Sequence, residues 1–176
     1  MPALAGLRGL PAEQAEPLLL LGLQQEAFMV RSLSCAGLGM KPTAAGWPAL
    51  VQALQQDEDA NVRAEAANAL VSHSLERAWP LLLEAFRRDS QWLLRCSVLS
   101  AVAEHPAMAS EDLLELARLA LADADGTVRV GGAEILGRLV RDGSPAVAGE
   151  ARRELQALQQ DPDHRVVAAA LNGLQG

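Results

Sequence analysis

Residues 57–70 decide the fold of this chain, and they read Asp57-Glu58-Asp59-Ala60-Asn61-Val62-Arg63-Ala64-Glu65-Ala66-Ala67-Asn68-Ala69-Leu70. The first five are acidic, small or amide residues, which is typical of a turn that ends in a helix N-cap. Counted from Val62, small or apolar residues follow four, five and eight positions later. This spacing marks one face of an amphipathic helix. The stretch therefore predicts a tight turn and a helix that buries one stripe.

The same pattern recurs along the chain at intervals of 32, 32, 34 and 38 residues. The equivalents of Val62, which we call frame residues, are Val30, Val62, Leu94, Val128 and Val166. An arginine follows the frame residue in the first four units, whereas Val167 takes that position in the fifth. Self-similarity at a fixed period predicts a repeat protein of about five units.

A second stretch with helical periodicity precedes each frame residue. These stretches cover about 11–24, 47–56, 79–88, 111–122 and 146–160. Pro48 and Pro80 are expected in first helical turns, where proline is tolerated. Each unit is then a hairpin of a helix A and a helix B, which cannot bury its stripe without a neighbouring hairpin. We predict an all-α fold, a right-handed α-α superhelix of about five helical hairpins.

Composition agrees with helices and restricts the function. The chain of 176 residues has 33 Ala and 31 Leu, but only 15 Val, Ile and Thr together. Ala and Leu favour helices, whereas strands favour β-branched and aromatic residues. The net charge of −7 argues against a protein that binds nucleic acid through its overall field. We expect one domain over 1–176, with approximate units 11–40, 41–74, 75–107, 108–142 and 143–176.

The cysteines and the apolar runs indicate the compartment. Cys35 and Cys96 both lie in apolar helical patterns, so we expect small core or contact residues rather than a disulfide framework. The longest apolar run, near Leu18–Leu23, is far shorter than the roughly 18–20 residues of a membrane span. The order of charges near the N-terminus is unlike that of a secretory signal. A reducing cytoplasm is therefore expected.

The motif resembles a known repeat family. The run Asp57-x-Asp59-x-x-Val62-Arg63-x-x-Ala66-x-x-x-Leu70 is similar to the HEAT repeat in its short bacterial form, and Asp123-x-Asp125-x-x-Val128-Arg129 repeats it. The resemblance covers nearly the whole chain after about residue 11, although Gln25 occupies the first Asp slot. It implies a HEAT/armadillo-like solenoid. The short form is shared by HEAT-like bilin lyases, phycobilisome-degradation proteins and many scaffold proteins, so it is weak evidence for function.

Two charged lines are expected along the stack. The arginines are Arg31, Arg63, Arg95 and Arg129, and the turn aspartates are Asp57, Asp89, Asp123 and Asp161. Half-buried charges need partners, so we interpret the lines as a structural ladder that holds the repeats in register. The alternative is an anion site for a phosphate or a bilin propionate. We expect Arg31 to contribute least, because its own unit lacks the Asp.

The helix B positions that point away from the A helices are expected to form the concave face. This strip is small and mildly polar, and the candidate partner-binding residues on it are Ser32, Glu65, Asn68, Ser97, Ser100, Glu134 and Arg138. Phe28 and Trp92 share one repeat position near the turns, and they are candidate aromatic anchors or covers of a neighbouring turn. Val166, Ala170 and Leu171 are expected to be exposed at the C-terminal end of the stack. We expect either a monomer or a weak end-to-end dimer through this surface.

No catalytic or metal-binding motif is recognised. Lys41, His73 and His105 are each 32 residues apart, at the ends of B helices, where the helix dipole favours a cation. We predict a non-catalytic protein-binding scaffold or adaptor, without metal or cofactor. The alternative is a bilin lyase-like or chaperone-like protein, which would bind a tetrapyrrole and a phycobiliprotein. The sequence leaves open the partner, the tetrapyrrole, the oligomeric state and whether the concave or convex face functions.

Overall fold

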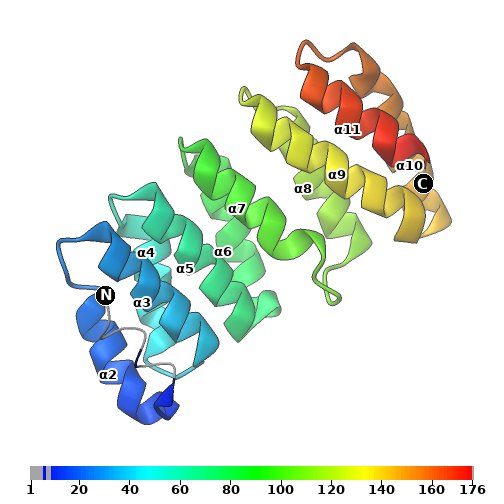
Figure 1. Ribbon diagram of the computed structural model, residues 1–176. Coiled ribbons are helices and arrows are strands. Elements are labelled where there is room, and N and C mark those ends of the chain that lie inside the picture. Colours follow the sequence, from blue (N-terminus) through cyan, green and yellow to red (C-terminus); the bar gives the residue numbers. More distant parts are fainter. Residues whose placement is uncertain (1–5, 7–8, 176) are drawn as a thin grey trace. The chain divides into compact units, whose positions relative to one another are not determined.

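The computed structural model describes Gly6 and residues 9–175, and within them it contains ten α-helices and no strand (Figure 1). The A helices are α2 (Ala12–Gly22), α4 (Gly46–Gln56), α6 (Leu75–Arg88), α8 (Ser110–Leu121) and α10 (Pro145–Ala157). The B helices are α3 (Phe28–Met40), α5 (Ala60–His73), α7 (Trp92–Ala103), α9 (Gly126–Asp142) and α11 (His164–Gln175), and the 3-10 turn η2 (Leu158–Gln160) extends α10. The predicted all-α class and the alternation of helices are confirmed.

The chain divides into two compact units, with the boundary between Ala101 and Val102 in α7. The prediction of one domain over 1–176 stays a prediction. In the first unit α5 packs against α3, α4 and α6, and the core contains Leu38, Leu50, Leu70 and Leu82. In the second unit α9 packs against α8, α10 and α11, around Leu113, Leu136 and Leu155. Each unit therefore stacks helical hairpins so that B helices lie against B helices.

Short polar side chains start the helices where the sequence predicts turns. The Asp59 side chain accepts a hydrogen bond from the backbone N–H of Asn61 at 2.8 Å, and Asp125 does the same for Thr127 at 2.7 Å. Such N-caps satisfy backbone donors that the helix cannot pair itself.

The predicted position of Pro80 in a first turn is wrong, because α6 begins at Leu75 and Pro80 lies inside it. The Ser74 side chain caps α6 by accepting from the N–H of Arg77, and this adds a turn before the proline.

Two contacts between B helices depend on small residues. A Cβ atom on Gly137 in α9 would lie 2.9 Å from the Cα of Gly173 in α11. A Cβ atom on Gly39 in α3 would lie 2.9 Å from the Cα of Ala69 in α5. Real Cβ atoms essentially never come this close to a backbone carbon. Glycine at these positions therefore sets the close spacing of the paired B helices.

The expectation of an exposed C-terminal end was wrong for two of its three residues. Val166 and Ala170 are fully buried, because α11 turns this stripe towards α9 and α10, whereas Leu171 is 44% exposed. The end-to-end dimer stays a prediction without these two side chains. Among the helices that the structure describes, none is both long and apolar enough to cross a membrane.

Candidate functional site

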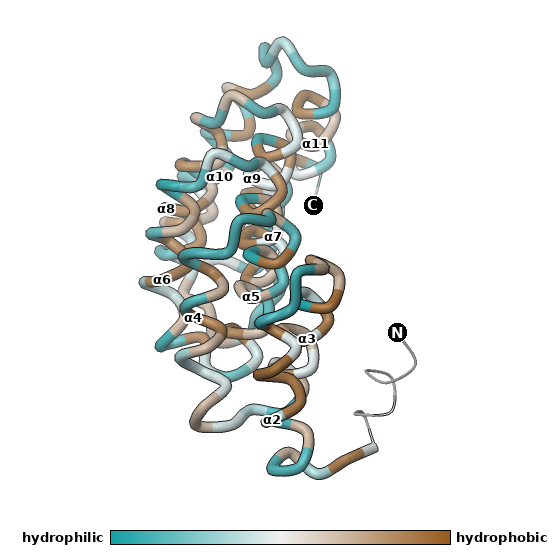
Figure 2. The backbone as a smooth tube through the Cα atoms, turned by 90° about the vertical axis from the view of Figure 1, so that its left-hand side faces the viewer, coloured by the Kyte–Doolittle hydropathy of each residue, from teal (hydrophilic) through white to brown (hydrophobic). Residues whose placement is uncertain are grey.

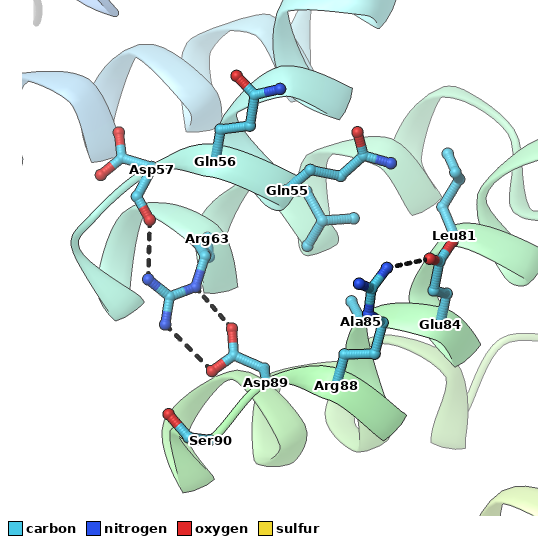
Figure 3. Close-up of a pocket in the computed structure, with 11 residues that line it drawn as sticks. Gln55, Gln56, Asp57, Arg63, Leu81, Glu84, Ala85, Arg88, Asp89 and Ser90 are labelled. Atoms are coloured by element: carbon cyan, nitrogen blue, oxygen red, sulfur yellow. Dashed lines mark hydrogen bonds and ion pairs between the residues drawn. The ribbon is translucent and has the colours of Figure 1, made fainter.

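Arg63 joins two neighbouring hairpins of the first unit. Its Nε donates to Oδ2 of Asp89 at 2.6 Å and its Nη2 donates to Oδ1 at 3.1 Å, so the ion pair is bidentate (Figure 3). Its Nη1 donates to the carbonyl oxygens of Asp57 and Glu58, at 2.8 and 3.1 Å. The side chains of Arg63 and Asp89 are only 13% and 11% exposed. One guanidinium thus binds its own turn and the turn of the next hairpin.

The same geometry recurs at Arg31 and Arg129. Arg31 binds both carboxylate oxygens of Asp57, at 2.8 and 3.0 Å, and the carbonyl oxygens of Gln25 and Glu26. Arg129 binds both carboxylate oxygens of Asp161, at 2.9 and 3.0 Å. The reason for expecting Arg31 to contribute least, the missing Asp in its own repeat, is therefore wrong, and its contribution to stability stays a prediction. Each of these arginines pairs with an aspartate of the following hairpin. The presence of Gln25 instead of an Asp in the first hairpin therefore does not affect Arg31.

The remaining members of the ladder have other recorded contacts. Arg95 donates from Nη1 to the carbonyl oxygen of Asp89 at 2.6 Å. Asp123 accepts from the N–H of Asp125 at 2.8 Å. The hydrogen bond from Arg129 lowers the pKa of Asp161, and the bond to Asp161 raises the pKa of Arg129. Since the guanidinium groups of Arg31, Arg63 and Arg129 donate to protein oxygens, the geometry at these three favours structural pairing over a free anion site.

The predicted partner-binding residues fall into both units. Ser32, Glu65, Asn68, Ser97 and Ser100 belong to the first, and Glu134 and Arg138 belong to the second. Ser100 and Glu134 are exposed and the others are half-buried. The Ser97 hydroxyl donates to the carbonyl oxygen of Ala64 at 3.2 Å, so it holds α7 to α5. Nη1 of Arg138 is buried without a hydrogen-bond partner.

Glu65 stands out among these residues by its electrostatic environment. It is half-buried, and burial raises the pKa of its carboxyl because the charged form is desolvated. Arg31 pairs with Asp57 and Arg63 pairs with Asp89, and within the described part of the chain Glu65 makes no ion pair. Glu65 is therefore a partly desolvated carboxylate without a cation of its own among these residues.

Large apolar side chains are exposed mainly on the first hairpin. Of the eight that are exposed in the described part of the chain, six lie on α2 and α3, namely Leu18, Leu21, Phe28, Met29, Leu33 and Met40. The two candidate aromatic anchors are both exposed, Phe28 at 42% and Trp92 at 45%. The sequence analysis did not single out Met29 or Met40. Their spacing with Leu33 along one helical stripe could have revealed them.

Two hollows lie on the A-helix side of the first unit. One has a volume of about 570 Å³ and is lined by α4, α6 and their turns, including Gln55, Gln56 and the Glu84–Arg88 pair (Figure 3). The other, of about 480 Å³, lies between α2 and α4 and is lined by Leu20, Leu23 and Gln52 among others. Neither hollow was predicted from the sequence, although several of the residues that line them are glutamines at or near the ends of α2 and α4.

The histidines and the lysine contact backbone and rings. Nε2 of His73 lies 2.9 Å from the carbonyl oxygen of Leu38, and the His73 ring is 6.0 Å from that of Trp47. Arg77 stacks its guanidinium 3.9 Å above the Trp47 ring. Lys41 donates to the carbonyl oxygen of Leu10 at 2.6 Å. In the described part of the chain, no three acidic, His or Cys side chains gather to hold a metal ion.

Stacked hairpins with an arginine–aspartate link between their turns define a helical repeat protein. A family model of HEAT repeats matches residues 15–103, half of the chain. The chain belongs to the HEAT-repeat family, whose members are commonly scaffolds for protein interactions. A search of curated proteins found no match to it.

Proposed function

We propose that the protein is a non-catalytic cytoplasmic scaffold that binds another protein through the exposed faces of its B helices. In the first unit this surface consists of Ser32, Leu33, Glu65, Asn68 and Ser100 with their neighbours on α3, α5 and α7. We call it the B-helix strip.

The observation that carries the proposal is the exposed apolar surface on α3, formed by Met29, Leu33 and Met40. A side chain such as Leu33, 41% exposed on a helix whose opposite face is buried, contributes little to folding. Contiguous apolar surface on a folded chain instead marks an interaction site. The small side chains along α5 and α7 leave room beside it for a segment of another protein. Cys35 is buried and Cys96 is half-buried, and neither is in a disulfide.

The test compares the two faces of the first unit. Asn68→Arg with Ser100→Arg places bulk and charge on the B-helix strip. Both positions are at least partly exposed, so folding should change by less than about 0.5 kcal/mol each. We expect this double variant to keep its helical circular dichroism and to lose capture of its partner from native lysate.

The matched variant is Gln52→Arg with Glu84→Arg, because these residues line the two hollows on the A-helix side. It should capture the partner normally. If the strip variant binds normally and the hollow variant does not, the A-helix side is the functional face and our assignment is wrong.

The bilin alternative is read from the same experiment. A tetrapyrrole needs an apolar pocket, whereas the larger of the two hollows is lined mainly by Gln, Asp, Glu and Arg side chains. Visible absorbance of a linear tetrapyrrole in the captured material would favour the alternative, and a colourless protein partner would support the scaffold.

A further inference from the structure

The first B helix carries a continuous apolar stripe on its open side. Met29, Leu33 and Met40 are 50%, 41% and 57% exposed, and Ala36 stands between them. Positions i, i+4, i+7 and i+11 fall on one side of an α-helix. From Met29 to Met40 the stripe covers 11 residue steps, which is about 16 Å at 1.5 Å per step, or three helical turns. Its length suits a short helix laid against it.

The stripe lies apart from the faces by which α3 is packed. Leu19 of α2 lies against Gly37, and Ala69 of α5 lies against Gly39. Leu18 and Leu21 of α2 are 48% and 55% exposed and add apolar surface on the same hairpin. Figure 2 shows hydrophobic residues, in brown, along α2 and in parts of α3. The first hairpin thus leaves apolar surface open after both of its packing contacts are made.

Glu65 provides the second observation. It occupies the same repeat position on α5 as Leu33 on α3, three residues after the frame residue. These two helices pack against each other. Burial raises the pKa of Cys35, which lies on α3, to about 12, and the negative charges of Asp57 and Glu65 add to this effect. Its repeat position on a helix that packs against α3 places the half-buried Glu65 carboxylate next to the apolar stripe, and within the described part of the chain it makes no ion pair.

We propose that this α3–α5 surface, formed by Met29, Leu33, Met40 and Glu65, binds an amphipathic helix of another protein. That helix places aliphatic side chains against the α3 stripe and a lysine or arginine against Glu65. The inference rests on the proposed scaffold function and deepens it by naming the class of partner. Apolar anchors at helical spacing in a groove are a recurring mode of peptide recognition.

Charge decides between such a helix and a second copy of this chain. In a two-fold contact the same patch meets itself. The patch contains Glu65 and no basic residue, so self-association would bring two half-buried carboxylates together without a cation. Like charges across an interface are unfavourable, whereas a basic helix compensates Glu65 directly. The apolar stripe and the acidic neighbour together fit a basic amphipathic helix.

The experiment selects helical 16-residue peptides from a random displayed library on the full-length protein. The selected peptides are then measured by fluorescence anisotropy. We expect enrichment of sequences with aliphatic residues at helical spacing and an adjacent Lys or Arg. Leu33→Asp and Glu65→Lys should each weaken their binding by about 10- to 100-fold. Changing the peptide's basic residue to Glu should restore binding to the Glu65→Lys variant.

Leu171→Asp and Glu134→Lys are the matched controls in the second unit. Leu171 and Glu134 are exposed on B helices, as Leu33 is, and these variants should bind the peptides normally. Circular dichroism checks that all four variants are folded.

The failures of the two proposals are distinguishable. The inference is overturned if the selected peptides lack a basic residue, or if they bind the Leu33→Asp and Glu65→Lys variants as tightly as the wild type. It is also overturned if no helical peptide is enriched. If the wild-type protein captures a partner from lysate and the Asn68→Arg, Ser100→Arg double variant does not, the scaffold proposal stands even though this inference fails. If neither a peptide nor a lysate partner depends on the B-helix strip, both proposals are wrong.

Discussion

Replacing Arg63 by alanine should destabilise the first unit strongly. The change removes two bonds to Asp89 and two to the carbonyl oxygens of the preceding turn. It leaves the carboxylate of Asp89, 11% exposed, with the backbone N–H of Gln91 as a recorded donor. Removing one partner of a buried ion pair lowers the free energy of unfolding by about 3–5 kcal/mol, whereas an exposed ion pair contributes only about 0–1 kcal/mol. Since Asp89 retains some contact with water, we expect a loss of about 2–4 kcal/mol.

Urea unfolding followed by circular dichroism measures this loss. Arg31→Ala should fall in the same range, because Arg31 makes the same set of contacts with Asp57 and its own turn. Arg88→Ala is the control, since its ion pair with Glu84 is 78% and 53% exposed, and it should change stability by less than about 0.5 kcal/mol. Arg63→Ala and Arg88→Ala variants of equal stability would refute the structural role of these pairs.

Three further predictions concern packing, pH and reactivity. Gly137→Ala should destabilise by about 1–3 kcal/mol, because the new Cβ would meet the backbone of Gly173 at 2.9 Å, whereas Gly149→Ala, with open space around it, should be neutral or slightly stabilising in thermal melts. The folded-state pKa of Asp161 is lowered by Arg129, so its contribution is complete above its unfolded pKa of about 3.9 and is lost as the pH falls through the folded value. Urea midpoints of an Arg129→Ala variant should therefore fall less steeply with acid than those of the wild type, and parallel profiles would contradict this. Cys96 should react with a thiol reagent at pH 8 in the folded protein, whereas Cys35, buried and with its pKa raised to about 12, should react only on unfolding; equal rates would show that Cys35 is accessible.

The hairpins could be read from the sequence because their signals are local. Helical periodicity and the turn residues placed α5 and its neighbours within a few residues of their observed bounds. The start of α6 was misplaced, since Ser74 was overlooked as a cap and Pro80 was given too much weight. The sequence pattern was sufficient to place a helix wherever its ends are set by residues within one helical turn, such as an N-cap.

Contacts between neighbouring hairpins could not be predicted in the same way. The partner of Arg31 lies 26 residues further along the chain, and no local rule decides between its own and the next turn. The burial of Val166 and Ala170 depends on how α11 lies on α9 and α10. The hollows beside α4 depend on the splay of whole helices. The stripe of Met29 and Met40 was visible in the sequence, but only the structure shows that both side chains are about half exposed.

The link from Arg31 to Asp57, and from Arg63 to Asp89, gives the stack a polarity. In the first unit, the first hairpin extends a guanidinium to the second and the second extends one to the third. In the second unit, Arg129 extends one to the hairpin that contains Asp161. A whole hairpin could thus be duplicated or deleted in such an array and the new neighbours would still find matching ends. Deleting only part of a hairpin would leave one charged side chain without its ion-pair partner. Gln25 in the first repeat and Val167 in the fifth are uncharged residues at positions where other repeats have Asp and Arg. Polarity of this kind lets a repeat protein change length in whole units while its charges stay balanced.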